Sequence, residues 1–142
     1  MDRLIELNLE SLKLGLLSSD RYYNKPLLIF NSASFCGYTK QLTSMQQIYE
    51  QGQVVPIALP TNEFGGQEPG DNIEINQYYQ NKFGITFPIT SKIDLQHKFF
   101  QTYGTPDWNF NKYLIDENGK LIGYWASAID PLSDSILNKI TN

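Results

Sequence analysis

The chain has 142 residues, of which 41% are hydrophobic and 13% aromatic, and its formal net charge is -4 at pH 7. A domain of this length buries about 68–70% of the surface that its unfolded chain exposes, so a core forms without disulfides or metals. No apolar run approaches the roughly 18 residues of a membrane helix, and charges of both signs are interspersed, which argues against a nucleic-acid-binding face. We therefore expect one soluble domain over residues 1–142.

The N-terminal segment MDRLIELNLESLKLGLLSS mixes charged residues into its apolar positions, so it lacks the features of a secretory signal. This pattern favours a cytoplasmic protein. The chain holds one cysteine, Cys36, and one histidine, His97. An internal disulfide is therefore excluded, a zinc site of the Cys/His type is not expected, and we predict no cofactor.

The first half of the chain predicts a strand, a helix and a second strand. Residues 26–31, PLLIFN, form a short apolar run typical of a buried parallel strand. The following helix, KQLTSMQQIYEQ, has apolar residues at helical spacing and ends at Gly52. The run VVPIALP, residues 54–60, predicts the second strand, in which Pro56 indicates an edge position or an interruption. Together these elements make a βαβ unit.

A loop rich in Gly, Pro and Asn, TNEFGGQEPGDN, separates this unit from a second helix. That helix, IEINQYYQNKF, carries the apolar residues Ile73, Tyr78 and Phe83 among polar ones and ends at Gly84. Residues 91–108 follow neither the helical nor the strand period, so we expect them to be irregular.

The last part of the chain predicts a β-hairpin and a closing helix. The runs FNKYLI and LIGYWA flank the turn DENGK, with Gly119 in the tight position. The segment PLSDSILNKI opens with Pro131 and has the apolar spacing of an amphipathic helix. Around one mixed sheet, this order predicts an α/β fold of the thioredoxin-like arrangement, a central mixed β-sheet flanked by α-helices.

Cys36 lies between the end of a predicted strand and a helix-like segment, in NSASFCGYT. Unpaired N–H groups and the helix dipole favour an anion there, so the position favours a reactive thiolate, although a small buried hydrophobe fits it equally well. A dithiol motif would need a second cysteine where Thr39 stands, so dithiol exchange is excluded. A lone thiol can still react with a peroxide, act with His97 in hydrolysis or be inert; His97, between Gln96 and Lys98, is interpreted as a surface-loop residue.

Four stretches of the chain, NSASFCGYT, LPTNEFGGQEPG, FGITFP and PDWNFNKYLIDENGK, resemble the signature blocks of the glutathione peroxidase family. They occur in the same order and cover residues 31–120. The resemblance implies a thioredoxin-like fold and a thiol peroxidase acting in antioxidant defence. It also implies a catalytic set in which Cys36 is the peroxidatic residue, Gln67 the glutamine of the FGGQEPG block, and Trp108 and Asn109 the WN pair. Whether Cys36 stands for a selenocysteine is not visible in the sequence.

The chemistry of peroxide reduction suits these residue types. A thiolate attacks the O–O bond, and the leaving oxygen must be stabilised and protonated. Trp108 offers an indole N–H, and Gln67 and Asn109 each offer an amide NH₂. The alternatives are core packing for Trp108 and a turn cap for Gln67; Phe110 is interpreted as core and Asn62 as a loop-shaping residue. The loop around Gln67 gains its tight turns from three glycines and a proline, Gly65, Gly66, Gly70 and Pro69.

The chain departs from the family at the resolving cysteine, which many cysteine-type members carry in the helix after the EPG turn. Tyr79 stands at the matching position. The sulfenic acid formed at Cys36 must then be reduced by an external thiol, glutathione or a thioredoxin-type reductant. No glutathione pocket is visible, although Lys40, Lys82 or Lys112 are possible contacts for its carboxylates.

The region between Asp94 and Trp108 is shorter than the family suggests, and this favours a monomer with an open site that admits hydrogen peroxide and organic or lipid hydroperoxides. Two other hypotheses stay open. A peroxide-sensing relay would pass oxidation of Cys36 to a partner protein by mixed disulfide, and a non-catalytic scaffold would keep only the fold. Retention of the four catalytic residues argues against the scaffold.

Overall fold

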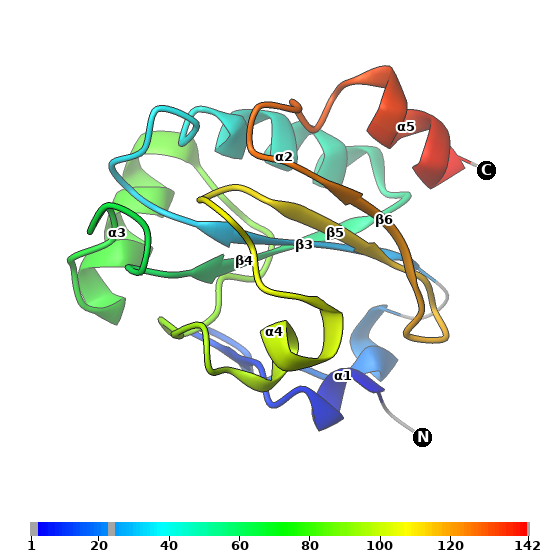
Figure 1. Ribbon diagram of the computed structural model, residues 1–142, viewed down its shortest axis with the longest axis horizontal. Helices are drawn as coiled ribbons and strands as arrows, with labels where there is room; N and C mark the ends of the chain where they lie inside the picture. Colours follow the sequence, from blue (N-terminus) through cyan, green and yellow to red (C-terminus); the bar gives the residue numbers. More distant parts are fainter. Residues whose placement is uncertain (1–2, 23–24, 142) are drawn as a thin grey trace.

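The computed structural model describes residues 3–22 and 25–141, and its centre is a four-stranded mixed sheet with the strand order β4-β3-β5-β6 (Figure 1). The strands are β3 (Leu27–Ser32), β4 (Val55–Pro60), β5 (Lys112–Ile115) and β6 (Leu121–Trp125). β3 pairs in parallel with β4 and antiparallel with β5, and β5 and β6 form the predicted hairpin. The predicted mixed sheet is therefore confirmed.

β4 is an edge strand, as Pro56 indicated. Its outer edge is partly covered by the segment that follows the second long helix. The Ala58 N–H donates to the carbonyl of Pro88 at 3.1 Å, and the Thr90 N–H donates to the carbonyl of Ala58 at 2.9 Å. These bonds satisfy backbone groups that would otherwise be free to pair with another chain.

Helices cover both faces of this sheet. The longer ones are α2 (Gln41–Gln51), α3 (Asn72–Phe83), α4 (Lys98–Tyr103) and α5 (Asp134–Thr141). The N-terminal part adds α1 (Arg3–Glu6), the 3-10 turn η1 (Ser19–Tyr22) and a small antiparallel pair, β1 (Glu10–Ser11) with β2 (Gly15–Leu16). In Figure 1, α2 and α5 lie on one side of the sheet and α1 and α4 on the other. Among the described residues, no helix is long and apolar enough to span a bilayer.

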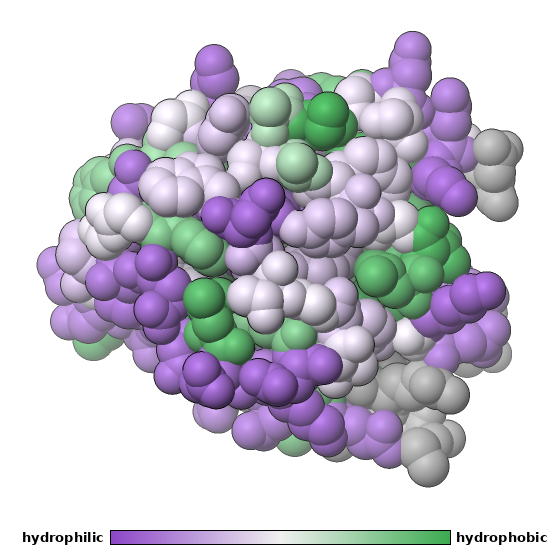
Figure 2. Space-filling view, in the orientation of Figure 1, coloured by the Kyte–Doolittle hydropathy of each residue, from purple (hydrophilic) through white to green (hydrophobic). Residues whose placement is uncertain are grey.

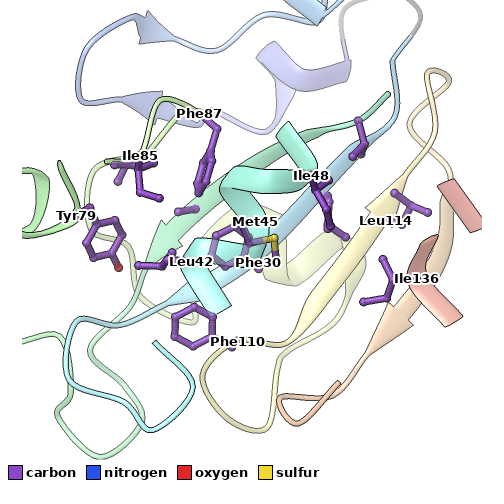
Figure 3. Packing of buried hydrophobic residues seen from close by; sticks show 14 of the residues in the cluster. Phe30, Leu42, Met45, Ile48, Tyr79, Ile85, Phe87, Phe110, Leu114 and Ile136 are labelled. Atoms are coloured by element: carbon purple, nitrogen blue, oxygen red, sulfur yellow. The ribbon is translucent and has the colours of Figure 1, made fainter. Parts of the chain in front are cut away.

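Alternation along β3 divides the core into two clusters. Leu28 and Phe30 join α2, α3 and α5 in one cluster, which Figure 3 shows from close by. Leu27 and Ile29 join α1 and α4 in the other. Because both faces are covered, β3 and β4 are buried along their whole length, which explains their continuous apolar sequences.

Helix α4 corrects the expectation that residues 91–108 are irregular. Phe99 and Phe100 are both buried in the second cluster, so packing stabilises a helix too short to show a clear period. His97 caps this helix, since its Nδ1 accepts a hydrogen bond from the Phe99 N–H at 3.1 Å. His97 itself lies in the bend that precedes α4, partly buried between the exposed Gln96 and Lys98, which agrees with its interpretation as a surface-loop residue.

Of the three apolar residues named for α3 from the sequence, Tyr78 and Phe83 pack, partly buried, against the first core cluster. Ile75 and Tyr79 are the buried residues of the helix, whereas Ile73 is 69% exposed. The helix ends at a left-handed glycine, Gly84, as expected from the sequence, and begins at a capping box between Asp71 and Glu74. The helix thus places Tyr79 fully inside the core and Tyr78 at its border.

The C-terminal elements agree with their predictions except at one boundary. The β5–β6 turn is closed by Asp116, and Gly119 has a φ of 84°, which a glycine adopts without strain. α5 begins at Asp134 and not at Pro131, which lies in the preceding turn. Ile136 is the fully buried residue of this helix.

Candidate active site

Cys36 is half-buried in the turn that follows β3. Its N–H donates to Oγ1 of Thr39 at 3.0 Å, and that hydroxyl donates to the carbonyl of Ala33 at 2.7 Å. Thr39, where a dithiol motif would have its second cysteine, thus holds the turn together. The Tyr38 N–H donates to Sγ of Cys36 at 3.4 Å. Because α2 begins only at Gln41, this turn and not the helix supplies the N–H next to the sulfur.

The loop that carries Gln67 is fastened to the Cys36 turn by its backbone. The carbonyl of Gln67 accepts a hydrogen bond from the N–H of Phe35 at 3.1 Å. Asn62 shapes the loop from within, since its Oδ1 accepts from the N–H of Glu68 at 2.9 Å. The structure therefore confirms the loop-shaping interpretation of Asn62 and brings Gln67 beside the residue that precedes Cys36.

Asn109 is fully buried and holds the side chain of Gln67. Its Nδ2 donates to Oε1 of Gln67 at 2.9 Å and to the carbonyl of Phe64 at 3.3 Å. Both hydrogens of this amide are therefore in use. The acceptor end of the Gln67 amide is occupied by Asn109, and its Nε2 is left as the donor.

Trp108 lies against the same loop and is 37% exposed, so the core-packing alternative is wrong. Its ring centroid is 5.8 Å from that of Phe64. A Cβ at Gly65 would lie 3.2 Å from Cη2 of Trp108, and Gly65 has a φ of +68°, so both contact and backbone require glycine there. The Trp108 carbonyl accepts hydrogen bonds from the side chains of Asn31 at 2.8 Å and Asn111 at 3.2 Å.

Trp108 and Asn109, from the segment that precedes β5, therefore both contact the loop of Gln67, and the Phe35 N–H connects that loop to the Cys36 turn. Within the part of the chain that the structure describes, Sγ of Cys36 accepts its hydrogen bond from the Tyr38 N–H, and none of the three side chains donates to it.

Lys112 corrects a further expectation. It is fully buried in β5, so it cannot meet the carboxylates of a ligand at the surface as suggested from the sequence. Desolvation lowers the pKa of its ammonium group to about 7, against the opposing charge of Asp130. Its Nζ donates to the carbonyl of Ser127 at 2.9 Å, and Oγ of Ser127 donates to the carbonyl of Asn109.

These hydrogen bonds of Lys112 and Ser127 were not predicted from the sequence, because a lysine in a short strand is normally exposed to solvent. Lys112 is buried because β5 is an inner strand of the sheet. A buried polar cluster made by Ser32, Ser34, Glu68 and Tyr79 was also not predicted. No sequence motif predicts these contacts, because they join residues up to 47 positions apart.

Two hollows differ in their relation to this site. The larger, about 580 Å³, is lined by residues of the N-terminal region, α3 and the segment 85–89, and none of the four predicted site residues lines it. The smaller, about 250 Å³, is lined by Ser34, Phe35, Glu68 and Pro69 among others. None of the four predicted site residues lines the smaller hollow either, but two of its lining residues are their neighbours in the sequence: Phe35 adjoins Cys36 and Glu68 adjoins Gln67.

The family model for glutathione peroxidase matches residues 5–102. The chain belongs to the glutathione peroxidase family. The glutathione peroxidase-like peroxiredoxin GPX5 of Chlamydomonas reinhardtii is 35% identical, over 77% of this chain and 77% of that protein. The glutathione peroxidase-like peroxiredoxin 2 of Saccharomyces cerevisiae is 34% identical, over 80% and 81% of the two chains. As a member of this family the protein is a thiol peroxidase, an oxidoreductase that reduces hydroperoxides with a thiol reductant.

Solved structures share the fold of this chain. The crystal structure of Trgpx in its apo form matches with a TM-score of 0.68 and 25% identity, over 98% of this chain and 95% of that chain. The solution structure of an oxidised thioredoxin-like protein also matches with a TM-score of 0.68, at 17% identity, over 96% and 97% of the chains. The predicted thioredoxin-like α/β fold is therefore confirmed.

Proposed function

We propose that Cys36 is the peroxidatic residue and that the protein reduces hydrogen peroxide and organic or lipid hydroperoxides. The observation that carries this proposal is the hydrogen bond from Asn109 to Gln67, on a loop that is itself bonded to the Cys36 turn. A relative from Helianthus annuus, a probable phospholipid hydroperoxide glutathione peroxidase, is 34% identical over 86% of this chain and 78% of that protein. It supports the lipid hydroperoxide as a substrate.

In the first step the thiolate of Cys36 attacks one peroxide oxygen. The S–O bond forms as the O–O bond breaks, and the leaving hydroxide or alkoxide takes up a proton to give water or alcohol. Gln67 Nε2 and Trp108 Nε1 are the donors for this leaving oxygen. Asn109, whose two amide hydrogens are already donated, acts through Gln67.

In the second step an external thiol attacks the sulfur of the sulfenic acid. Water leaves, a mixed disulfide forms, and a second thiol releases Cys36 and the oxidised reductant. Glutathione and a thioredoxin-type protein are the proposed reductants. Cys36 is the one cysteine of the chain, and a tyrosine, Tyr79, stands at the position matched to a resolving cysteine, so the chain supplies no internal thiol for this step.

We further propose a single-domain, cytoplasmic monomer. Both hydrophobic clusters pack on one sheet, which supports a single domain. On the face shown in Figure 2, apolar residues form small patches between polar ones, and this supports a monomer because stable interfaces need larger apolar areas. The names of the relatives describe peroxidases and peroxiredoxins and do not favour the relay.

The test is the second-order rate constant for oxidation of Cys36 by hydrogen peroxide. We expect a value orders of magnitude above that of free cysteine, a large fall in Gln67→Ala, and no change in Gln77→Ala, which alters an exposed glutamine of α3. Steady turnover with glutathione, absent in Cys36→Ser, distinguishes an enzyme from a relay, which would instead accumulate one mixed disulfide. A wild-type rate equal to that of free cysteine would contradict the proposal.

A further inference from the structure

A buried carboxylate lies between the two segments that carry Cys36 and Gln67. Glu68 is fully buried, and its Oε1 accepts a hydrogen bond from the hydroxyl of Ser34. Its Oε2 lies 2.7 Å from the hydroxyl of Tyr79, and that hydroxyl lies 2.7 Å from Oγ of Ser32. We refer to Ser32, Ser34, Glu68 and Tyr79, all buried, as the Glu68 cluster.

The hydrogen atoms of the cluster fit an ionised carboxylate. Tyr79 has one hydroxyl hydrogen, so it cannot donate to both Ser32 and Glu68. If Ser32 donates to Tyr79, then Tyr79 and Ser34 each donate to one oxygen of Glu68, and every hydrogen points toward the carboxylate. Figure 3 shows the ring of Tyr79 at the border of the core, with its hydroxyl oxygen pointing away from Ile85 and Phe87. The partners of this hydroxyl are Ser32 and Glu68.

A charge is rarely buried without a cation or several hydrogen bonds, because desolvation is costly. Burial raises the pKa of Glu68, while the hydrogen bonds from Ser34 and Tyr79 and the charge of Lys92 oppose this shift. Within the described residues, no ammonium or guanidinium group forms an ion pair with Glu68; Nζ of Lys92 donates to the carbonyl of Gly70 at 2.8 Å. The carboxylate therefore depends on neutral donors, the hydroxyls of Ser34 and Tyr79 and the backbone of Ser34.

The position of the cluster shows what it restrains. Ser34 and Phe35 immediately precede Cys36, and Gln67 and Glu68 are consecutive. The Phe35 N–H bonds to the Gln67 carbonyl, and the Ser34 hydroxyl bonds to the Glu68 carboxylate. These neighbouring bonds, one from the backbone and one from side chains, fasten the two segments to each other. Tyr79 adds α3 as the third element held at this point.

We propose that Glu68 is a positioning residue of the peroxidatic site: its carboxylate, held by Ser34 and Tyr79, keeps the donor loop of Gln67 in register with the turn of Cys36. The proposal rests on the peroxidase function of Cys36. A carboxylate suits this role because it accepts at both oxygens, and hydrogen bonds to a charged acceptor are roughly twice as strong as neutral ones. A glutamine of the same shape presents an NH₂ donor at one end, so it cannot accept from both hydroxyls.

Two reactions of Cys36 separate positioning from general stability. Oxidation by hydrogen peroxide needs the thiolate and the donors for the leaving oxygen, whereas alkylation by iodoacetamide needs the thiolate alone. We expect Glu68→Gln to lower the oxidation rate about tenfold or more while the alkylation rate at the same pH stays within about twofold, because a displaced donor loop affects only the first reaction. A purely structural role would leave the ratio of the two rates unchanged.

Matched controls lie beside each changed residue. Glu63→Gln removes an exposed carboxylate of the same loop, and Tyr78→Phe removes the hydroxyl of the neighbouring, half-exposed tyrosine; both are expected to keep the wild-type ratio. Tyr79→Phe, which removes only one donor to Glu68, is expected to lower the ratio several-fold, and it decides the matter if Glu68→Gln does not fold. An unchanged ratio in the folded Glu68 and Tyr79 variants would overturn the proposal. Failure of the proposed function itself is seen separately, as a wild-type oxidation rate no higher than that of free cysteine.

Discussion

Asn109 and Gln67 are joined by a hydrogen bond of 2.9 Å, from Nδ2 of the first to Oε1 of the second. The bond fixes which end of the Gln67 amide is free, because the acceptor end is occupied. A buried asparagine thereby sets the direction of a half-buried glutamine, and the donors at the site depend on a residue that itself donates elsewhere.

Replacing Asn109 by alanine is expected to lower the rate of Cys36 oxidation by roughly 10²-fold, the usual effect of losing one preorganised donor. The free energy of unfolding should fall by only about 1 kcal/mol, because one of the amide's own atoms, Oδ1, has no partner to lose. Stopped-flow oxidation and urea unfolding measure the two quantities. Asn138→Ala, at an exposed position of α5, is the control and should change neither. An unaltered oxidation rate in Asn109→Ala would show that Gln67 does not need its partner.

Gly65→Ala is expected to displace Trp108 and lower the oxidation rate several-fold. The new Cβ would lie 3.2 Å from Cη2 of Trp108, in addition to the strain of a residue with φ of +68°. Gly66→Ala carries similar strain at φ of +60° but has nothing within 4 Å of its Cβ. Both variants should lose about 1 kcal/mol of stability, and only the first should lose peroxidase rate. Equal oxidation rates in Gly65→Ala and Gly66→Ala would show that the contact with Trp108 does not matter for the reaction.

Trp108→Phe tests the indole N–H directly. A phenylalanine keeps an aromatic ring against Phe64 but offers no donor, so we expect about a tenfold loss in oxidation rate with little change in unfolding. Trp125→Phe is the matched control, because Trp125 packs against the first core cluster and not against the Gln67 loop. The rate of alkylation by iodoacetamide should be unchanged in Trp108→Phe. A fall in both the oxidation and the alkylation rate would mean that Trp108 acts on the thiolate and not on the leaving oxygen.

Lys112 predicts a rise of stability with pH. Its pKa is about 7 in the folded protein and about 10.4 in an unfolded chain, so between these values the unfolded state binds more protons. The free energy of unfolding therefore increases with pH in this window, by up to about 1.4 kcal/mol per unit from this group. The penalty of the buried ammonium is fully present below pH 7 and is relieved as the group loses its proton.

Urea unfolding at pH 7.5, 8.5 and 9.5 measures this effect as the difference between wild type and Lys112→Met. Comparing the two proteins cancels the other groups that titrate in the window. As the pH rises, the free energy of unfolding of the wild type should increase relative to that of Lys112→Met. Lys120→Met, at an exposed turn position, should show no such trend relative to the wild type. A constant difference between wild type and Lys112→Met would mean that the ammonium is not desolvated.

Particular elements show why some features were predictable. β3 and β4 were visible because strands covered on both faces have continuous apolar sequences, and α2 and α3 because glycine is suited to the left-handed conformation at their ends. α4 was missed because its six residues are too few to show a period and its stability comes from Phe99 and Phe100. The burial of Ile75 and the exposure of Ile73 could not be predicted because both are apolar, and only the position of α3 over the sheet selects between them.

The sequence by itself determined the order of the main elements, the absence of a second cysteine, and the family blocks that contain Cys36, Gln67, Trp108 and Asn109. These follow from local preferences and from residue identity, which neighbours along the chain reveal. Only the tertiary structure decided that Asn109 donates to Gln67, that Lys112 is buried and that Glu68 joins Ser34 and Tyr79. Such contacts bring together segments far apart in the chain, and their energy depends on burial and distance, which no local pattern encodes.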